Sequence, residues 1–195
     1  MTLRQKIEQE IRERGPIPFS RYMELCLYDP DLGYYSRNAE QFGKAGDFYT
    51  SSDVHAVFGR LLARQFEEMW RVLGSPEQIV ILELGPGRGL FAQDVLDWSE
   101  KKFPDFFRAA HYTLAERSPA LRQRLESTLS KHFRSGKASL TQPLKPLPND
   151  VTVERALAPE VPVIVFANEF FDALPVEVLS AVSYTHLTLP TILRV

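Results

Sequence analysis

One stretch of the chain, residues 79–96, constrains the fold more than any other. It begins with an apolar run at 79–84 whose β-branched residues fit a strand buried in a parallel sheet. The turn that follows carries Gly85, Gly87 and Gly89, and residues 90–96 then have helical spacing. Strand, glycine turn and helix cradle a nucleotide in doubly wound folds, because backbone N–H groups can approach the ligand and the helix N-terminus adds a positive field. A tight turn without a ligand is the alternative.

The spacing of the glycines separates two classes of nucleotide-binding protein. The fingerprint of nicotinamide-dependent oxidoreductases is G-x-G-x-x-G, and here Gly89 comes one residue early. An acid near the strand end, Glu83, followed by G-x-G-x-G resembles the pattern of S-adenosylmethionine-dependent methyltransferases. The oxidoreductase stays an alternative, which saturable binding of NADH without binding of S-adenosylmethionine would favour.

Hydrophobic periodicity predicts alternation of strands and helices from residue 76 onward. The order βαβαβ…β predicts a doubly wound, Rossmann-like α/β sheet, preceded by an N-terminal helical cap. We expect strands at 79–84, 112–116, 138–140 and 163–167, and helices at 2–14, 20–28, 53–73, 90–103 and 118–136.

The segment 53–73 gives the strongest helical signal, with Ser52 or Asp53 as its cap and Gly74 at its end. Its apolar residues are expected to trace one face, formed by Val57, Phe58, Leu61, Leu62, Phe66, Met69, Trp70 and Leu73.

Size and charge favour an ordinary enzyme domain. The 195 residues can bury a core, and a net charge of −2 gives no reason to expect general nucleic-acid binding. The single cysteine, Cys26, excludes an internal disulfide and fits a reducing compartment. No apolar stretch approaches the roughly 20 residues of a membrane span, and the N-terminus lacks the features of a signal peptide. We therefore expect a cytoplasmic protein.

Polar residues that could carry chemistry follow two of the expected strands, where open parallel sheets bind ligands. Glu116 closes the second strand, and a carboxylate there can accept hydrogen bonds from both ribose hydroxyls of an adenosine. An exposed acid paired with Arg117 is the alternative. Asn168, Glu169 and Asp172 follow the last strand, beside an aromatic pair at 170–171. These acids could hold a cationic substrate, or they could be solvated while the aromatic rings belong to the core.

Three motifs together resemble the MidA-like class I methyltransferases: residues 46–51, 83–89 and 168–176, with a similar stretch at 22–35. The resemblance runs in matching order from about residue 17 to residue 176. It implies a seven-stranded methyltransferase sheet, of which the first four strands lie here. The family includes bacterial proteins and the mitochondrial methyltransferase that assists assembly of respiratory complex I. Ser52 and Asp53 stand where the family commonly has Pro-Glu.

The resemblance also implies a cofactor and roles for individual residues. S-adenosylmethionine would lie with its amino-acid end over residues 83–89 and its ribose on Glu116, and Asp47 and Thr50 would contact the methionine part or the substrate. Mitochondrial relatives modify an arginine of a partner protein, so Glu169 and Asp172 could clamp a guanidinium group. A non-catalytic assembly factor with the same fold is the alternative. No metal is expected, because the spacings of His55, His111 and His132 build no metal site.

The last residues are expected to be foreign to the natural protein. Residues 182–191 resemble the translation of a sequencing-library adapter, although a genuine strand and turn is the alternative. We therefore expect a fragment in three parts: a cap at 1–75, a partial methyltransferase domain at 76–181 and a non-native tail at 182–195. We expect this fragment alone to be poorly soluble and inactive.

Overall fold

The computed structural model of the chain describes residues 1–36, 55–141, 161–181 and 187–188. The chain forms two compact units: residues 40–168 make up one, and residues 1–39 together with 169–195 make up the other. The predicted boundary at residue 75 does not coincide with this division and stays a prediction. We call the two parts the sheet unit and the N-terminal unit, and describe each by itself.

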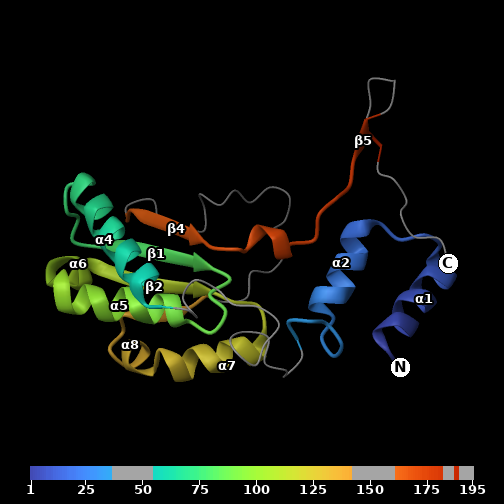
Figure 1. Cartoon of the computed structure of the whole chain (residues 1–195), viewed down its shortest axis with the longest axis horizontal. Helices are drawn as coiled ribbons and strands as arrows, with labels where there is room; N and C mark the ends of the chain where they lie inside the picture. The colour runs from blue at the N-terminus through green and yellow to red at the C-terminus, as the bar shows by residue number, and fades with distance from the viewer. Residues whose placement is uncertain (37–54, 142–160, 182–186, 189–195) are drawn as a thin grey trace. The chain divides into compact units, whose positions relative to one another are not determined.

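A parallel sheet of four strands is the centre of the sheet unit. The strands are β1 (Ile79–Leu84), β2 (Ala110–Ala115), β3 (Ala138–Leu140) and β4 (Val163–Ala167). Their order in space is β3-β2-β1-β4, and β4, β1 and β2 can be followed side by side in Figure 1. The expected strands and the α/β class are confirmed. The strand order reverses between the parallel strands β1 and β4, and this is the switch point at which such sheets bind ligands.

The described helices of this unit are, in chain order, α4 (Val57–Val72), α5 (Leu90–Lys102), α6 (Pro104–Ala109), α7 (Pro119–Thr128) and α8 (Ser130–Arg134). Helix α6 was not expected from the sequence; it begins with a proline at its first position. The helix predicted at 118–136 is interrupted at Leu129, whose ψ of 18° leaves the helical range. Its predicted start is confirmed, since Ser118 accepts a hydrogen bond from the N–H of Leu121.

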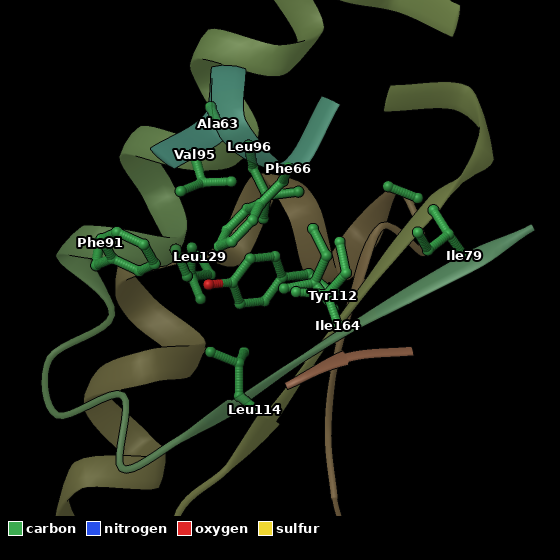
Figure 2. Packing of buried hydrophobic residues seen from close by; sticks show 14 of the residues in the cluster. Ala63, Phe66, Ile79, Phe91, Val95, Leu96, Tyr112, Leu114, Leu129 and Ile164 are labelled. Atoms are coloured by element: carbon green, nitrogen blue, oxygen red, sulfur yellow. The ribbon is translucent and has the colours of Figure 1, made fainter. Parts of the chain in front are cut away.

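One apolar cluster joins the helices to one face of the sheet (Figure 2). In β1 and β2 every second residue is buried and the residues between them are half-buried. In the described part of the unit, one face of each of these strands is therefore buried more completely than the other. Figure 2 shows members of this cluster: Ala63, Phe66, Ile79, Phe91, Val95, Leu96, Tyr112, Leu114, Leu129 and Ile164.

Helix α4 buries a narrower face than the sequence predicted. Ala63 and Phe66 lie in the core, and Phe58, Leu62 and Trp70 pack against it. Successive helix residues are turned by about 100°, so the eight predicted positions cover too wide an arc to face the sheet together. Four of the eight are exposed: Val57 and Leu61 lie at one side of that arc, whereas Met69 lies in the last turn of the helix and Leu73 is its C-cap.

The start of α4 also differs from the prediction. The helix begins at Val57, four residues after Asp53, and its N-cap Ala56 offers no side-chain acceptor. Instead, His55 Nδ1 accepts a hydrogen bond from the Val57 N–H at 3.0 Å. Ser52 and Asp53 lie outside the described residues. Gly74 follows the helix with a φ of 86°, as its predicted place at the helix end requires.

The N-terminal unit holds α1 (Leu3–Arg14) and α2 (Phe19–Tyr28), close to their predicted bounds. The N-cap of α2 is Pro18, so the predicted start at Ser20 was one residue late. Ile11, Ile17 and Leu25 form a small core. The same unit contains the short helix η2 (Phe171–Ala173) and the paired strands β5 (Ser180–Ala181) and β6 (Leu187–Thr188). A foreign origin of residues 182–195 stays a prediction.

None of the described helices is long and apolar enough to span a lipid bilayer.

Candidate cofactor site

The glycine turn lies directly after β1, at the carboxyl edge of the sheet. Gly85, Gly87 and Gly89 have φ values of 66°, 54° and 79°, a conformation that side chains with a Cβ rarely adopt. The N–H of Gly85 donates to the Ala115 carbonyl at 3.1 Å, and this bond ties the turn to the end of β2. Glycine is therefore required by the backbone itself at these positions, and the turn leads straight into α5.

The third glycine also has a packing role. A Cβ on Gly89 would come within 2.6 Å of Leu125 Cδ2 on α7, closer than real Cβ contacts allow. Its N–H donates to the Pro86 carbonyl at 2.9 Å, which closes the turn. Gly89 thus lets the start of α5 approach α7, a role that the sequence did not reveal.

Glu83 is a buried acid two residues before the turn. Its side chain lies on the face of β1 that the helices cover, and only 4% of the residue is exposed. Oε2 accepts a hydrogen bond from the Tyr112 hydroxyl at 2.9 Å. Burial raises the pKa of Glu83 to about 8, and the Tyr112 bond opposes that rise. At neutral pH the protonated form of this carboxyl group therefore predominates.

Glu116 follows β2 and is held by the turn into α7. Its Oε1 accepts the Ser118 N–H at 2.8 Å. Arg122 Nη1 donates to the backbone carbonyls of Glu116 and Thr141, at 2.9 and 3.0 Å. Burial raises the pKa of the Glu116 carboxyl, and the backbone N–H groups of Ser118 and Arg117 act in the opposite direction. The carboxyl group is thus fixed in place rather than free on a surface loop.

Strand register brings these groups to one edge of the sheet. Leu84 pairs with Ala115 on one side and with Ala167 on the other. The glycine turn, Glu116 and the half-buried Asn168 therefore each follow the end of one of three adjacent parallel strands. The structure thus brings these predicted positions to one edge of the sheet, and their role in binding a ligand stays a prediction.

The other two predicted catalytic residues, Glu169 and Asp172, belong to the N-terminal unit. Glu169 is exposed and has a φ of 47°, a left-handed conformation that costs energy for a residue with a side chain. Asp172 is exposed within η2. The rings of Phe170 and Phe171 meet edge to face at 5.5 Å, and Phe171 is 69% exposed. The alternative of two core phenylalanines is therefore wrong for Phe171.

Two further predictions fall outside the described residues: Asp47 and Thr50. Among the residues that the structure does describe, no group of three or more His, Cys, Asp or Glu side chains could hold a metal ion. His132 is buried in α8 and pairs with Asp97 at 2.8 Å, and His111 lies in β2 with Ser139 Oγ 2.8 Å from its Nε2.

Tyr112, the hydrogen-bond partner of Glu83, was not expected from the sequence to take part in the site. Its position in the apolar run of β2 marks it as a core residue, and nothing in the local pattern indicates a polar contact. Only the strand pairing, which places Glu83 beside Leu114, brings the two side chains together.

A parallel sheet with this strand order, a G-x-G-x-G turn after β1 and an acid after β2 fits the class I methyltransferase fold, and the residues fit an adenosine-bearing cofactor. A family model described as "Putative S-adenosyl-L-methionine-dependent methyltransferase" matches residues 61–186. The chain belongs to this family of S-adenosylmethionine-dependent methyltransferases, as the resemblance to MidA-like proteins predicted.

Similar proteins include two curated relatives and a solved structure. The chain is 34% identical to a mitochondrial protein arginine methyltransferase NDUFAF7 homolog of Drosophila melanogaster, over 93% of this chain and 42% of the relative. It is 32% identical to the mitochondrial protein arginine methyltransferase NDUFAF7 of Danio rerio, over 87% of this chain and 42% of the relative. A COG1565 superfamily protein from Burkholderia thailandensis, solved with S-adenosyl-homocysteine bound, matches with a TM-score of 0.68 and 29% identity, over 89% of this chain and 42% of that one. The chain thus spans less than half the length of these relatives.

Proposed function

We propose that the complete protein transfers a methyl group from S-adenosylmethionine to an arginine side chain of a partner protein. The observation that carries this proposal is the edge of the sheet where the glycine turn and Glu116 lie together. The arginine acceptor is supported by the names of the mitochondrial relatives, which are protein arginine methyltransferases.

Different described residues would bind different parts of the cofactor. The Gly87 N–H would bind its amino-acid end, because the N–H groups of Gly85 and Gly89 already donate within the protein and Pro86 has none. Glu83 is close to the same turn. The Glu116 carboxyl group would accept hydrogen bonds from the ribose hydroxyls. When bound, the cofactor supplies a methyl group already activated on a sulfonium ion. The protein then has mainly to align the acceptor with that methyl group and to exclude water, and alignment can lower a barrier by up to about 7–11 kcal/mol in favourable cases.

Glu169 and Asp172 have the chemistry to hold a guanidinium group. A carboxylate pair can accept several of its N–H donors and orient one nitrogen toward the methyl group. Asn168 offers an amide at the end of β4 for the same acceptor. Asp47 and Thr50 complete the proposed contacts to the methionine part or the substrate.

The proposed place of action is a reducing compartment: the cytoplasm of a bacterium, or the mitochondrial matrix for eukaryotic relatives. The curated relatives are mitochondrial proteins, and the single cysteine of this chain is compatible with either place.

Labelled methyl transfer tests the proposal. Full-length protein is incubated with methyl-labelled S-adenosylmethionine and a lysate from cells that lack the gene, and labelled proteins are identified by mass spectrometry. We expect methylarginine in a specific protein. The matched variants are Glu116→Gln, which should lose most of the labelling, and Glu126→Gln, an exposed glutamate on α7 that should keep it.

Two outcomes would contradict the proposal. Label on a residue other than arginine would disprove the acceptor. Cofactor binding without any labelled product would favour the non-catalytic assembly factor.

A further inference from the structure

Tyr112 is a fully buried tyrosine to which the proposed function gives no role. It lies in the middle of β2, and its ring is surrounded by apolar side chains of the core cluster (Figure 2). Its hydroxyl donates a hydrogen bond to Glu83 Oε2 at 2.9 Å. The two side chains come from adjacent strands and form a polar pair inside an otherwise apolar cluster.

Burying such a polar pair lowers the stability of the fold, so its presence needs an explanation. Removing a phenol and a carboxyl group from water costs energy that one hydrogen bond only partly returns, and two apolar residues could fill the same space without that cost. The pair stands at the end of β1, where Glu83 is followed after one residue by Gly85 of the cofactor turn. The location therefore suggests a role toward the cofactor rather than toward stability.

The protonation state of the pair is adjustable near neutral pH. Burial raises the pKa of Glu83 to about 8, whereas the hydrogen bond from Tyr112 lowers it. The pKa of Tyr112 lies well above its usual value of 10, so the hydroxyl stays a donor throughout the physiological range. Within the described part of the chain, burial and Tyr112 are the two influences on Glu83.

We propose that Tyr112 is a positioning residue of the cofactor site, which holds the Glu83 carboxyl group at the end of β1 and stabilises its ionised form when the cationic methionine part of S-adenosylmethionine binds. This role rests on the proposed function. Binding then breaks the O–H bond of the Glu83 carboxyl group and releases the proton to solvent, and no other covalent bond changes. The ionised carboxylate faces a positive charge on one side and keeps the Tyr112 hydroxyl as its donor on the other.

The sign of the pH dependence follows from this proton release. Because the bound state holds fewer protons, affinity for the cofactor rises with pH and levels off near the pKa of Glu83 in the empty protein. Without the Tyr112 donor the carboxylate is less stable. Tyr112→Phe should therefore bind about tenfold more weakly near neutral pH, as expected for loss of one hydrogen bond to a charged group. The gap should narrow at higher pH.

Titration calorimetry of full-length protein with S-adenosylmethionine measures both effects. Runs in two buffers that differ in ionisation enthalpy give the protons released on binding. The wild type should release protons at about pH 7, and Glu83→Gln should release fewer, because its amide has no proton to lose. The amino group of S-adenosylmethionine also titrates, and it does so in every experiment. The proton release of Glu83 is therefore read from the difference in released protons between wild type and variant. Ser99→Ala is the matched control, because it removes a buried hydroxyl on α5 and should bind like the wild type.

A second readout needs no cofactor. Carbon-13 NMR of glutamate carboxyl groups, with Glu83 assigned through Glu83→Gln, follows the titration of Glu83 in the empty protein. Tyr112→Phe should move its midpoint upward. If Tyr112→Phe leaves both this midpoint and the affinity unchanged, the role of Tyr112 is wrong. If the complete protein binds no S-adenosylmethionine, the proposed function fails together with this role, while the NMR titration still reports on the pair.

Discussion

The side chain of Leu125 occupies the space that a side chain on Gly89 would need. A Cβ built on Gly89 falls 2.6 Å from Leu125 Cδ2 and 3.3 Å from Leu129 Cδ1. Both leucines are fully buried in the core of the sheet unit. The third glycine of the turn therefore couples the start of α5 to α7, in addition to any contact with a cofactor.

Gly89→Ala should be more destabilising than alanine at another left-handed glycine. The added methyl group meets Leu125, and the φ of 79° strains any residue with a side chain, so we expect a loss of about 2–4 kcal/mol in the free energy of unfolding. Gly136→Ala is the control, because its φ of 71° imposes a similar strain with nothing within 4 Å of the new methyl group. Urea denaturation of both variants measures the difference. Equal losses in the free energy of unfolding of the two variants would mean that Leu125 moves aside without an energetic cost.

Gly87→Ala should weaken cofactor binding. A side chain at this φ of 54° would alter the backbone that we expect to face the ligand. The expected loss is about tenfold in affinity for S-adenosylmethionine, equivalent to roughly 1.4 kcal/mol. Gly74→Ala, after α4, is the control with a φ of 86° and open space around it. If Gly87→Ala binds S-adenosylmethionine with unchanged affinity, this turn is not part of the binding site.

Glu83→Gln should change how stability depends on pH. The folded pKa of about 8 lies above the ordinary value of 4.5, so the folded state binds the proton more tightly than the unfolded state. The stability associated with Glu83 is complete below the unfolded value and is lost as the pH rises through the folded value. Relative to the wild type, Glu83→Gln should gain up to about 1.4 kcal/mol per pH unit between these limits. Denaturation curves at several pH values test this, and parallel pH profiles would disprove it.

Asp29 is expected to stabilise the N-terminal unit in a pH-dependent way. Its buried carboxylate pairs with Lys6, and its Oδ1 accepts the N–H groups of Asp31 and Leu32 at 3.2 and 3.0 Å. The pKa of Asp29 is lowered, chiefly by the hydrogen bond from Lys6, so this stabilisation exists above the unfolded value of 3.8 and is lost as the pH falls through the lower folded value.

Asp29→Asn should therefore cost about 1–3 kcal/mol at neutral pH and much less in acid. Asp31→Asn, an exposed neighbour in the same loop, should have little effect. Far-UV circular dichroism is the suitable probe, because both tryptophans, Trp70 and Trp98, lie in the sheet unit. A loss in Asp29→Asn that persists in acid would contradict the ionic contribution.

Asp172→Asn should separate catalysis from cofactor binding. If Asp172 holds the acceptor guanidinium, the variant should lose about a hundredfold in kcat/KM and keep its affinity for S-adenosylmethionine. Glu177→Gln is the matched control in the same segment, since its carboxylate contacts Ser20 within the N-terminal unit. Full activity of Asp172→Asn would exclude the proposed clamp.

The local elements of the sheet unit could be predicted because their signals are local. The apolar, β-branched runs predicted β1 and β4 at their observed bounds, and Ser118 with Pro119 predicted the start of α7. The edge of the sheet that gathers the glycine turn and Glu116 followed from the order of strands alone, since parallel strands end on the same side.

The burial of particular side chains could not be predicted in the same way. Val165 lies in the middle of the apolar run of β4, yet it is 55% exposed. In the described part of the sheet β4 stands at an edge, next to β1 alone, and the composition of a strand does not show its neighbours.

The sequence by itself determined the order of strands and helices and the glycine turn, because backbone preferences act over a few neighbouring residues. Tertiary structure alone decided that Tyr112 meets Glu83, 29 residues away, and that Gly89 lies against Leu125. Such contacts depend on how helices and strands pack against one another. The pattern of neighbouring residues in the sequence does not show which residue of a distant helix or strand will be in contact.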